Sequence, residues 1–469
     1  MSVWKHSGRL IAAVMLLAVC LCAGAAAFSG ELTALAGDGG TTMEYESELF
    51  DTDGIMEIDI RIDEGDWENL LANATAEEYF ECDVAVNGET VYNAAIRAKG
   101  NTSLTTIAAD PTTDRYSFKI EFDHYVDGQT CFGLDKLVLN NNYADATNMK
   151  EALIYDMYRY FGADASLYNY AKISVNGEYW GVYLALEAVE DSFMLRNYGA
   201  QSGELYKPDG MNIGGGFDMG DFDMGGFSFG GFSLGGGGAD LNYTDDDPDS
   251  YSTIWEGAKT DAADADRERV ITALRHISEG SELETYMDVD NLLRYMAVHV
   301  FSVNEDSLSG MMAHNYYLYE YDGQLNIIPW DYNLALGGMS GSSAASVVNE
   351  AIDNAFSGTN FFDTLMENET YHAQYCEYLR RLVDEYINGG FGFGGQGGAS
   401  DAAPADSGSS DMPQLPEGFN ISDFGGGELP EGFDPSGFGG ALAQYGLSLG
   451  VFAAALIFAL LYRRRPRRR

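Results

Sequence analysis

Residues Asp288–Gly338 read DVDNLLRYMAVHVFSVNEDSLSGMMAHNYYLYEYDGQLNIIPWDYNLALGG and carry the clearest local signals in the chain. The first part predicts a helix with an N-cap at Asp290, because apolar residues recur at helical spacing: Leu292, Leu293, Met296, Ala297, Val300 and Val303. Two β-rich runs follow at Asn315–Tyr321 and Gln324–Pro329, and the dipeptide Asp322-Gly323 between them predicts a tight hairpin turn. The predicted order is therefore helix, acidic loop, hairpin and acidic loop.

The predicted hairpin brings the two acidic loops to the same end of its strands. Four residues with side-chain oxygens lie in these loops and can converge there: Asp306, Asn315, Asp331 and Asn333. Mg²⁺ prefers oxygen ligands and usually shares its coordination shell with substrate phosphates. Protein kinases use the same order, with a base Asp, a metal-binding Asn, a hairpin and a metal-binding Asp. The segment therefore predicts a site for a metal-bound phosphate group.

The composition is strongly acidic. The chain has 469 residues, with 73 Asp and Glu against 26 Lys and Arg, and a formal net charge of −47. Such a surface repels nucleic acid and anionic lipid, so nucleic-acid binding is not expected. Two explanations stay open. The charge serves solubility or adaptation to salt, or it attracts basic partners and divalent cations.

The cysteines do not predict a metal site. Cys20 and Cys22 lie in an apolar N-terminal run, and Cys82, Cys131 and Cys376 lack zinc-type spacing. At most one disulfide can form among the last three within one chain, and its pairing cannot be deduced from sequence.

Both ends of the chain predict targeting to a membrane. Residues 1–28 resemble a secretory signal peptide, or an uncleaved N-terminal anchor. Residues 441–462 are uncharged and mostly apolar, which predicts a transmembrane helix. The tail at 463–469 reads RRRPRRR and is expected in the cytoplasm by the positive-inside rule. The predicted location is a single-pass protein of the cell membrane with its main domain extracytoplasmic.

Between these ends we expect one folded domain at 45–388, with a Gly/Phe-rich insert at 210–240 and a Gly/Pro-rich linker at 389–440. Strand patterns dominate its first part, an amphipathic helix at 147–161 interrupts them, and helical patterns dominate after residue 267. This order predicts an α+β fold with a smaller β-rich lobe and a larger helical lobe. A nucleotide would fit the cleft between the lobes.

Taken together, several segments resemble the CotH kinase family, the spore coat protein H-like atypical secretory protein kinases. The resemblance covers about residues 50–385, and its motifs are RAKGNTS (97–103), YSFKIEF (116–122), LNNNYADATNMKEALIYDMYRYFG (139–162), ISVNGEYWGVYLALEAVEDSF (173–193), GELYKPDG (203–210) and the segment quoted first. It implies an atypical protein-kinase-like two-lobed fold. It also implies ATP with Mg²⁺ or Mn²⁺ as cofactors and transfer of the γ-phosphoryl group to Ser or Thr of surface or secreted proteins.

The resemblance also implies roles for individual residues. Asp306 would orient and deprotonate the acceptor hydroxyl, and Lys119 would pair with phosphate oxygens. Glu151 or Glu187 would hold that lysine. The implied metal ligands are Asp331, Asn315 and Asn333. The remaining residues expected in the nucleotide pocket are Arg97, Lys99, Asn101 and Lys207.

Three departures from the kinase pattern keep other functions open. Asp306 and Asn315 lie nine positions apart instead of five, and no GxGxxG motif precedes Lys119. Asn333 stands where the family pattern has a second acidic residue. The alternatives are a kinase-fold surface module for binding or adhesion with little or no catalysis, and phosphoryl transfer to a non-protein acceptor. Glu187 can also be a structural salt-bridge partner, and Lys119 a solvent-facing strand residue.

Overall fold

The computed structural model describes residues 40–199, 203–209, 237–310, 313–338, 351–353, 356 and 358–389. The predicted segment 1–28, the transmembrane helix at 441–462 and the tail at 463–469 lie outside these ranges, as do most of the insert at 210–240 and of the linker at 389–440. Within the described ranges, every helix is too short or too polar to span a bilayer.

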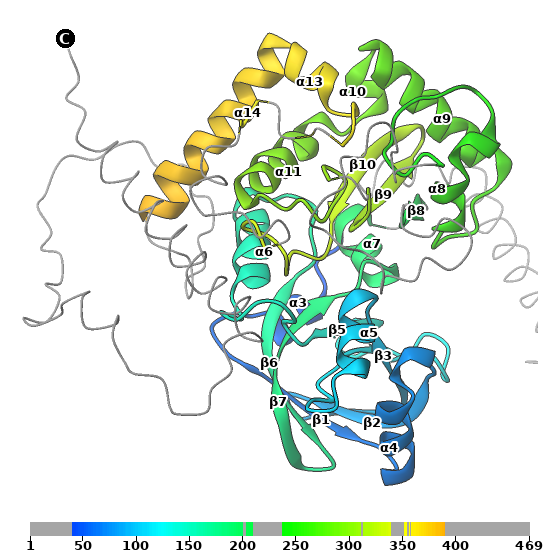
Figure 1. Ribbon diagram of the computed structural model, residues 1–469, viewed down its shortest axis with the longest axis vertical. Helices are drawn as coiled ribbons and strands as arrows, with labels where there is room; N and C mark the ends of the chain where they lie inside the picture. Colours follow the sequence, from blue (N-terminus) through cyan, green and yellow to red (C-terminus); the bar gives the residue numbers. More distant parts are fainter. Residues whose placement is uncertain are drawn as a thin grey trace, which may run out of the picture.

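Seven strands form a closed barrel in the order β1-β2-β3-β4-β5-β7-β6 (Figure 1). All neighbours pair antiparallel except β1 and β6, which pair parallel with Ile58 opposite Ile173 and close the barrel. Alternate residues point inward and build a buried core that includes Ile58, Val84, Ile96, Phe118, Ile120, Leu137, Leu139 and Tyr183. The strands are β1 Met56–Arg61, β2 Phe80–Val86, β3 Glu89–Lys99, β4 Ser117–Glu121, β5 Lys136–Asn140, β6 Tyr168–Val175 and β7 Glu178–Glu187.

The barrel corrects the predicted fold class. The expected α+β fold was kinase-like, with a β-rich lobe and a helical lobe. This expectation is wrong, because the strands of the first part close into a seven-stranded barrel. Closure depends on the pairing of β1 with β6, whose partners Ile58 and Ile173 lie 115 residues apart. Local patterns indicate where strands form, but they do not indicate which distant strand pairs with which.

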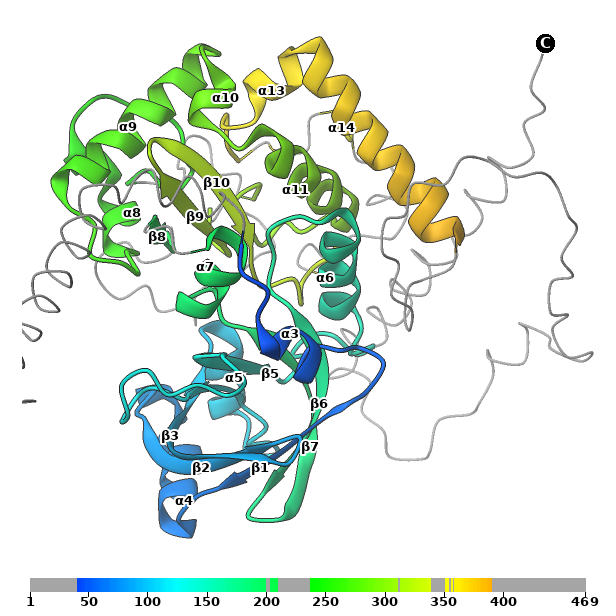
Figure 2. The same ribbon diagram turned by 180° about the vertical axis from the view of Figure 1, so that it is seen from behind.

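A second sheet, in the order β10-β9-β8, lies among the helices at the opposite end of the molecule from the barrel (Figures 1 and 2). Its strands are β8 Glu204–Tyr206, β9 Tyr316–Tyr321 and β10 Gln324–Pro329. The hairpin of β9 and β10 forms as predicted, and both turn residues have positive φ, +49° at Asp322 and +88° at Gly323.

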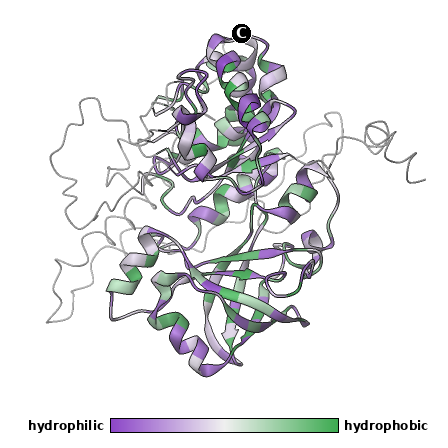
Figure 3. Ribbon diagram, turned by 90° about the vertical axis from the view of Figure 1, so that its right-hand side faces the viewer, coloured by the Kyte–Doolittle hydropathy of each residue, from purple (hydrophilic) through white to green (hydrophobic). Residues whose placement is uncertain are grey.

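Most helices surround this second sheet, while α3, α4 and α5 lie against the barrel (Figure 2). Hydrophobic and hydrophilic residues mix along single helices and strands, as expected when one side of each element is buried (Figure 3). The helices are α3 Glu44–Glu48, α4 Glu64–Ala72, α5 Thr102–Ala109, α6 Lys150–Phe161, α7 Asp191–Tyr198, α8 Ser252–Glu256, α9 Asp264–Glu279, α10 Leu283–Tyr286, α11 Val289–Ser302, α13 Asp363–Glu367 and α14 Glu369–Arg381, with a π-helical turn at Leu382–Ile387 and 3₁₀ turns at Ala74–Ala76 and Pro248–Tyr251.

Helix α6 connects the barrel to the helical part. The outward-facing residues Val138, Leu184 and Leu186 of the barrel belong to the same buried core as α6 and α11. Helix α11 begins two residues earlier than predicted, because Asp288, not Asp290, accepts the capping bond from the backbone N–H of Asn291. The loop after β10 contacts α6 and the residues that follow β5, since the backbone N–H of Tyr332 donates to Glu151 and the Asn333 amide donates to the carbonyl oxygen of Tyr143.

Candidate functional site

The two acidic loops meet at one end of the β9–β10 hairpin. Pro329 pairs with Tyr316, so the residues after β10 lie beside the residues before β9. Several described non-glycine residues in these loops adopt positive φ, between +46° and +58°: Val303, Ala313, Asn315, Asp331 and Leu336. Non-glycine residues rarely adopt this conformation, and such strain concentrates at functional sites.

Asn304 joins the two loops. Its buried side-chain amide donates to the carbonyl oxygen of Asp331 at 3.3 Å, and its side-chain oxygen accepts the backbone N–H of Asp306 at 3.3 Å. Asn315 supports the same loop, since its amide nitrogen donates to the carbonyl oxygen of Asp306 at 2.9 Å and to the Asp306 carboxylate at 3.1 Å. The backbones that carry Asp306 and Asp331 therefore lie within reach of one side chain.

His314 belongs to the first acidic loop and lies near Asp331 of the second. Its Nε2 is 2.8 Å from Asp306 Oδ1. Burial opposes the charged imidazole, but the bond to Asp306 and the nearby carboxylates of Asp209 and Asp331 outweigh it and raise the pKa of His314. A cationic His314 would hold the Asp306 carboxylate in place.

A buried carboxylate faces these loops from α6. Glu151 accepts hydrogen bonds from Asn140 Nδ2 at 2.8 Å and from the backbone N–H of Tyr332 at 3.4 Å. Burial, followed by the charge of Asp331, raises the pKa of Glu151 to about 7, although Lys99 partly offsets this effect. Lys99 in turn donates to Asn140 Oδ1 at 3.1 Å. The lysine that interacts with Glu151 is therefore Lys99, whereas the sequence suggested Lys119.

Two lysines lie over the ring of Trp330. The ammonium of Lys99 is 5.7 Å from the ring centroid, and that of Lys207 is 5.6 Å away and also 5.5 Å from the ring of Tyr317. Burial, followed by the charge of Lys99, lowers the pKa of Lys207 to about 8. Within the described part of the chain neither lysine forms an ion pair. Among the described residues, these two cations thus share one aromatic surface and no carboxylate lies within ion-pair distance of either.

Lys119 is already paired. It projects from β4 and binds Glu190 at 2.6 Å and Glu121 at 3.0 Å. Neither of its predicted partners, Glu151 or Glu187, forms an ion pair with it in the described ranges. Its charge is therefore less available to an incoming phosphate than the charges of Lys99 and Lys207.

Glu187 belongs to a structural network. It is fully buried and binds Arg196 through two bonds of 2.9 and 2.6 Å, and it accepts from the Tyr45 hydroxyl at 2.5 Å and from the backbone N–H of Leu167 at 3.0 Å. These partners connect α7 and α3 to the end of β7. The same carboxylate cannot also hold a catalytic lysine.

The remaining predicted residues lie at different places. Arg97 is bonded to Glu77 and lies over the ring of Tyr79, with no bond to the acidic loops among its described contacts. Asn101 is exposed at the start of α5. Asn333 follows Asp331 closely, and its amide nitrogen donates to the carbonyl oxygen of Tyr143 at 3.1 Å. The residues brought together are Lys99, Glu151, Lys207, Asp306, Asn315 and Asp331.

A family model described as CotH kinase protein matches residues 96–391, which is more than half of the chain. The chain belongs to the CotH kinase family. The match contains Lys99, Glu151 and both acidic loops, whereas β1 and β2 precede it.

This CotH-family chain is also similar to inner spore coat protein H of Bacillus subtilis (strain 168). The two are 25% identical over 264 residues, which cover 55% of this chain and 64% of that protein. The relative is a spore coat protein by name, and no helix in the described ranges can span a bilayer. The name of this relative runs against the predicted single-pass location in the cell membrane. The segment 441–462, on which that prediction rests, lies outside the described residues.

The sequence patterns predicted no site role for Asn140, Asn304, Trp330 or His314 in this CotH-family chain. A signal existed for two of them, because Asn140 begins an Asn-Asn-Asn run and Trp330 directly precedes Asp331. Asn304 had no separate signal, since a single Asn after a helix is most often a turn residue.

A buried hydrogen-bond network centred on His299 supports the first acidic loop. His299 on α11 bonds Ser309 at 2.7 Å and Tyr332 at 2.8 Å, and the Ser309 hydroxyl donates to the carbonyl oxygen of Asn304 at 3.2 Å. Burial lowers the pKa of His299 to about 3. Neutral His299 therefore supports the loop that carries Asp306.

We expect this network to make the fold sensitive to acid. Below its ordinary pKa of about 6.5 the unfolded His299 takes up a proton, while the folded one stays neutral down to about pH 3. Stability is thus lost as the pH falls through this window, by roughly 2–3 kcal/mol between pH 6.5 and 4.5. Urea unfolding at several pH values should show that the free energy of unfolding depends less steeply on pH in His299→Gln than in the native chain. His276→Gln, on α9, should keep the original slope, and an unchanged slope in His299→Gln would contradict the expectation.

Proposed function

We propose that this chain is an ATP-dependent protein kinase that transfers the γ-phosphoryl group to Ser or Thr of a protein acceptor. The observation that carries the proposal is the pair of lysines over Trp330. Lys99 and Lys207 lack a carboxylate partner in the described ranges, although the chain carries a net charge of −47. Partly buried cations without a counter-ion favour a bound polyanion.

The residues fit a metal–nucleotide complex. Lys99 and Lys207 would neutralise phosphate oxygens, and Asp331 with the side-chain oxygens of Asn315 and Asn333 would hold Mg²⁺ or Mn²⁺. The amide nitrogens of both asparagines are already bonded, which leaves their oxygens available as ligands. The cation would supply charge neutralisation across the phosphates.

Asp306 is the proposed acceptor of the substrate hydroxyl proton. Its bonds to His314 and Asn315 fix its orientation, so its main contribution would be to position the hydroxyl. Glu151 would fix Lys99 through Asn140 and would respond to the charge bound beside Asp331. Catalysis would rest on positioning and charge neutralisation, as is general for phosphoryl transfer.

The test is incubation of the purified full chain with γ-labelled ATP, Mg²⁺ or Mn²⁺ and a Ser/Thr-rich acceptor protein. Metal-dependent label on Ser or Thr supports the proposal. The absence of label with either metal, together with thermal stabilisation by metal-ATP, would instead favour a binding module of the same fold. Asn333, which replaces a charged ligand by a neutral one, is the observation that favours this second function.

Lys99 on β3 and Lys119 on β4 should differ in their importance for catalysis. We expect Lys99→Met to lower kcat/KM for ATP by about 100-fold or more, because Lys99 faces Glu151 and has no carboxylate partner in the described ranges. Lys119→Met should cost less than about 5-fold, since Glu190 and Glu121 already neutralise this lysine. Steady-state kinetics of both variants provide the measurement. A larger loss in Lys119→Met than in Lys99→Met would restore the assignment made from sequence.

A further inference from the structure

A second group of metal-ligating side chains lies on α14, separate from the site between the acidic loops. His372 and Cys376 are one helical turn apart and point to the same side of the helix. Asp353, from the segment 351–353, reaches them from outside the helix. The ligand atoms of these three residues all lie within 4.8 Å of one another.

The distances match a shared metal ion. Cys376 Sγ is 3.8 Å from His372 Nε2, and the same Nε2 is 3.0 Å from Asp353 Oδ1. Sulfur, nitrogen and oxygen ligands about 2.0–2.3 Å from a tetrahedral zinc ion lie roughly 3.3–3.6 Å from each other. These two separations lie on either side of this range, and the ligand atoms of Cys376 and Asp353 lie within 4.8 Å of each other, so side-chain rotations would place all three atoms in the first coordination shell.

The arrangement does not fit a nucleophilic Cys–His–Asp triad. In such a triad the acid bonds one ring nitrogen and the nucleophile bonds the other. Here Asp353 and Cys376 both approach Nε2 of His372. Three donor atoms that converge on one point, from one side of the imidazole ring, are the arrangement of a metal site.

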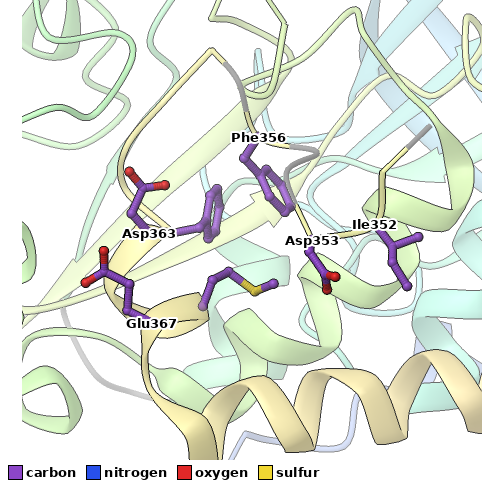
Figure 4. Close-up of a pocket in the computed structure, with 7 residues that line it drawn as sticks. Ile352, Asp353, Phe356, Asp363 and Glu367 are labelled. Atoms are coloured by element: carbon purple, nitrogen blue, oxygen red, sulfur yellow. The ribbon is translucent and has the colours of Figure 1, made fainter.

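A hollow adjoins the cluster and leaves room for a further ligand. It has a volume of about 200 Å³ and is lined by Ile352, Asp353, Phe356, Asp363 and Glu367, among others (Figure 4). The segment that carries Asp353 is held to α14 by a second contact, because the hydroxyl of Tyr375 donates to the carbonyl oxygen of Ile352 at 2.8 Å. Asp353 thus lies between α14 and an open space that water can enter.

We propose that Asp353, His372 and Cys376 bind one Zn²⁺ ion, with water from the hollow as the fourth ligand. A thiolate, an imidazole and a carboxylate together favour Zn²⁺ over Mg²⁺, which prefers oxygen ligands only. The ion connects the segment 351–353 to α14, which packs on α11, the helix that leads into the Asn304–Asp306 loop. This site does not depend on the proposed phosphotransfer.

The test measures Zn²⁺ binding to the full chain, without a polyhistidine tag, by competition with a chromophoric chelator. We expect tight binding of one ion and a loss of affinity of roughly 100-fold or more in Cys376→Ala and in His372→Ala. Asp363→Asn, a carboxylate change in the same hollow, is the matched control and should keep affinity within about 3-fold. Circular dichroism confirms that each variant is folded.

Co²⁺ provides a readout that does not depend on the stability of the variants. Bound to the native chain, it should give a thiolate-to-metal charge-transfer band and strong visible d–d bands typical of four-coordination. Asp331→Asn should leave both features unchanged. The proposal is overturned if the native chain binds no Zn²⁺, if Co²⁺ gives no thiolate band, or if Cys376→Ala binds as tightly as the native chain.

Discussion

Asp331→Asn should lower the rate of phosphoryl transfer by on the order of 1,000-fold and weaken metal-dependent ATP binding as well. Asp331 is the charged member of the proposed ligand set, since Asn315 and Asn333 are neutral. A neutral amide at this position keeps an oxygen atom but leaves the cation without its carboxylate. In the native chain the Asp331 carboxylate also adds negative charge beside Glu151. The loss of this charge in Asp331→Asn should lower the pKa of Glu151 toward its ordinary value.

The matched comparison is Asp306→Ala. Because Asp306 would act on the acceptor hydroxyl, its loss should lower kcat by a similar factor and leave the affinity for metal-ATP within a few-fold. Steady-state kinetics combined with calorimetric titration of Mg²⁺-ATP separates the two effects. Asp322→Asn, at the exposed turn of the same hairpin, is the control for the substitution itself. An Asp331→Asn variant that retains a tenth or more of the rate would show that this carboxylate holds no catalytic metal.

Glu187→Ala should be the most destabilising single substitution proposed for this chain, at about 3–5 kcal/mol. The change removes a fully buried carboxylate and leaves the Arg196 guanidinium without its ion-pair partner. It also removes the closer of two acceptors of the Tyr45 hydroxyl, at 2.5 Å, and leaves the carbonyl oxygen of Ser192 at 3.1 Å. Breaking one side of a buried pair costs more than the pair contributes, because the remaining charge stays desolvated.

Urea unfolding provides the measurement, with Glu178→Ala as the control at the exposed start of the same strand, β7. That variant should change the free energy of unfolding by less than about 0.5 kcal/mol. A folded Glu187→Ala variant that has near-native stability but a weakened affinity for ATP would instead restore the nucleotide role predicted from sequence.

The sequence was most informative where the residues that interact with one another lie in the same short segment. The helix, the hairpin and the two loops of Asp288–Gly338 are fixed by spacing and by a turn dipeptide, and the loops do meet. Their catalytic and metal-binding roles remain predictions. What the pattern could not supply is Asn304, whose importance depends on the close approach of two backbones.

The choice between the lysines shows how small the missing information was. Lys99 lies opposite Ser117, two residues along the strand pair from Lys119, on the same outer face of the barrel. Two residues along a strand correspond to about 6.6 Å. That shift moves an ammonium from the carboxylates of Glu121 and Glu190 to Asn140 and Glu151. Hydrophobic alternation is identical for both positions, so only the register of β3 on β4 distinguishes them.

The surroundings of Glu187 and Cys376 could not be predicted from the sequence for a related reason. A glutamate at the end of a strand has the same local pattern whether it faces a ligand or an arginine, and Arg196 follows on a different element. Cys376 lacks zinc-type spacing because Asp353, the third residue of the proposed zinc site, comes from a separate segment. Residues that acquire their partners only through the fold carry little signal in one sequence.

The closed barrel also sets the limits of the smallest autonomous unit. The family match starts at residue 96, inside β3, and so excludes β1, β2 and Tyr45. A fragment cut at that boundary would lose β1, β2 and most of β3, and the opened barrel would expose its apolar interior and unpaired strand edges to water. It would also lose Tyr45, which donates a hydrogen bond to Glu187. The segment shared across relatives is therefore not self-sufficient, and recombinant work should retain the preceding fifty or so residues from about residue 40 onward.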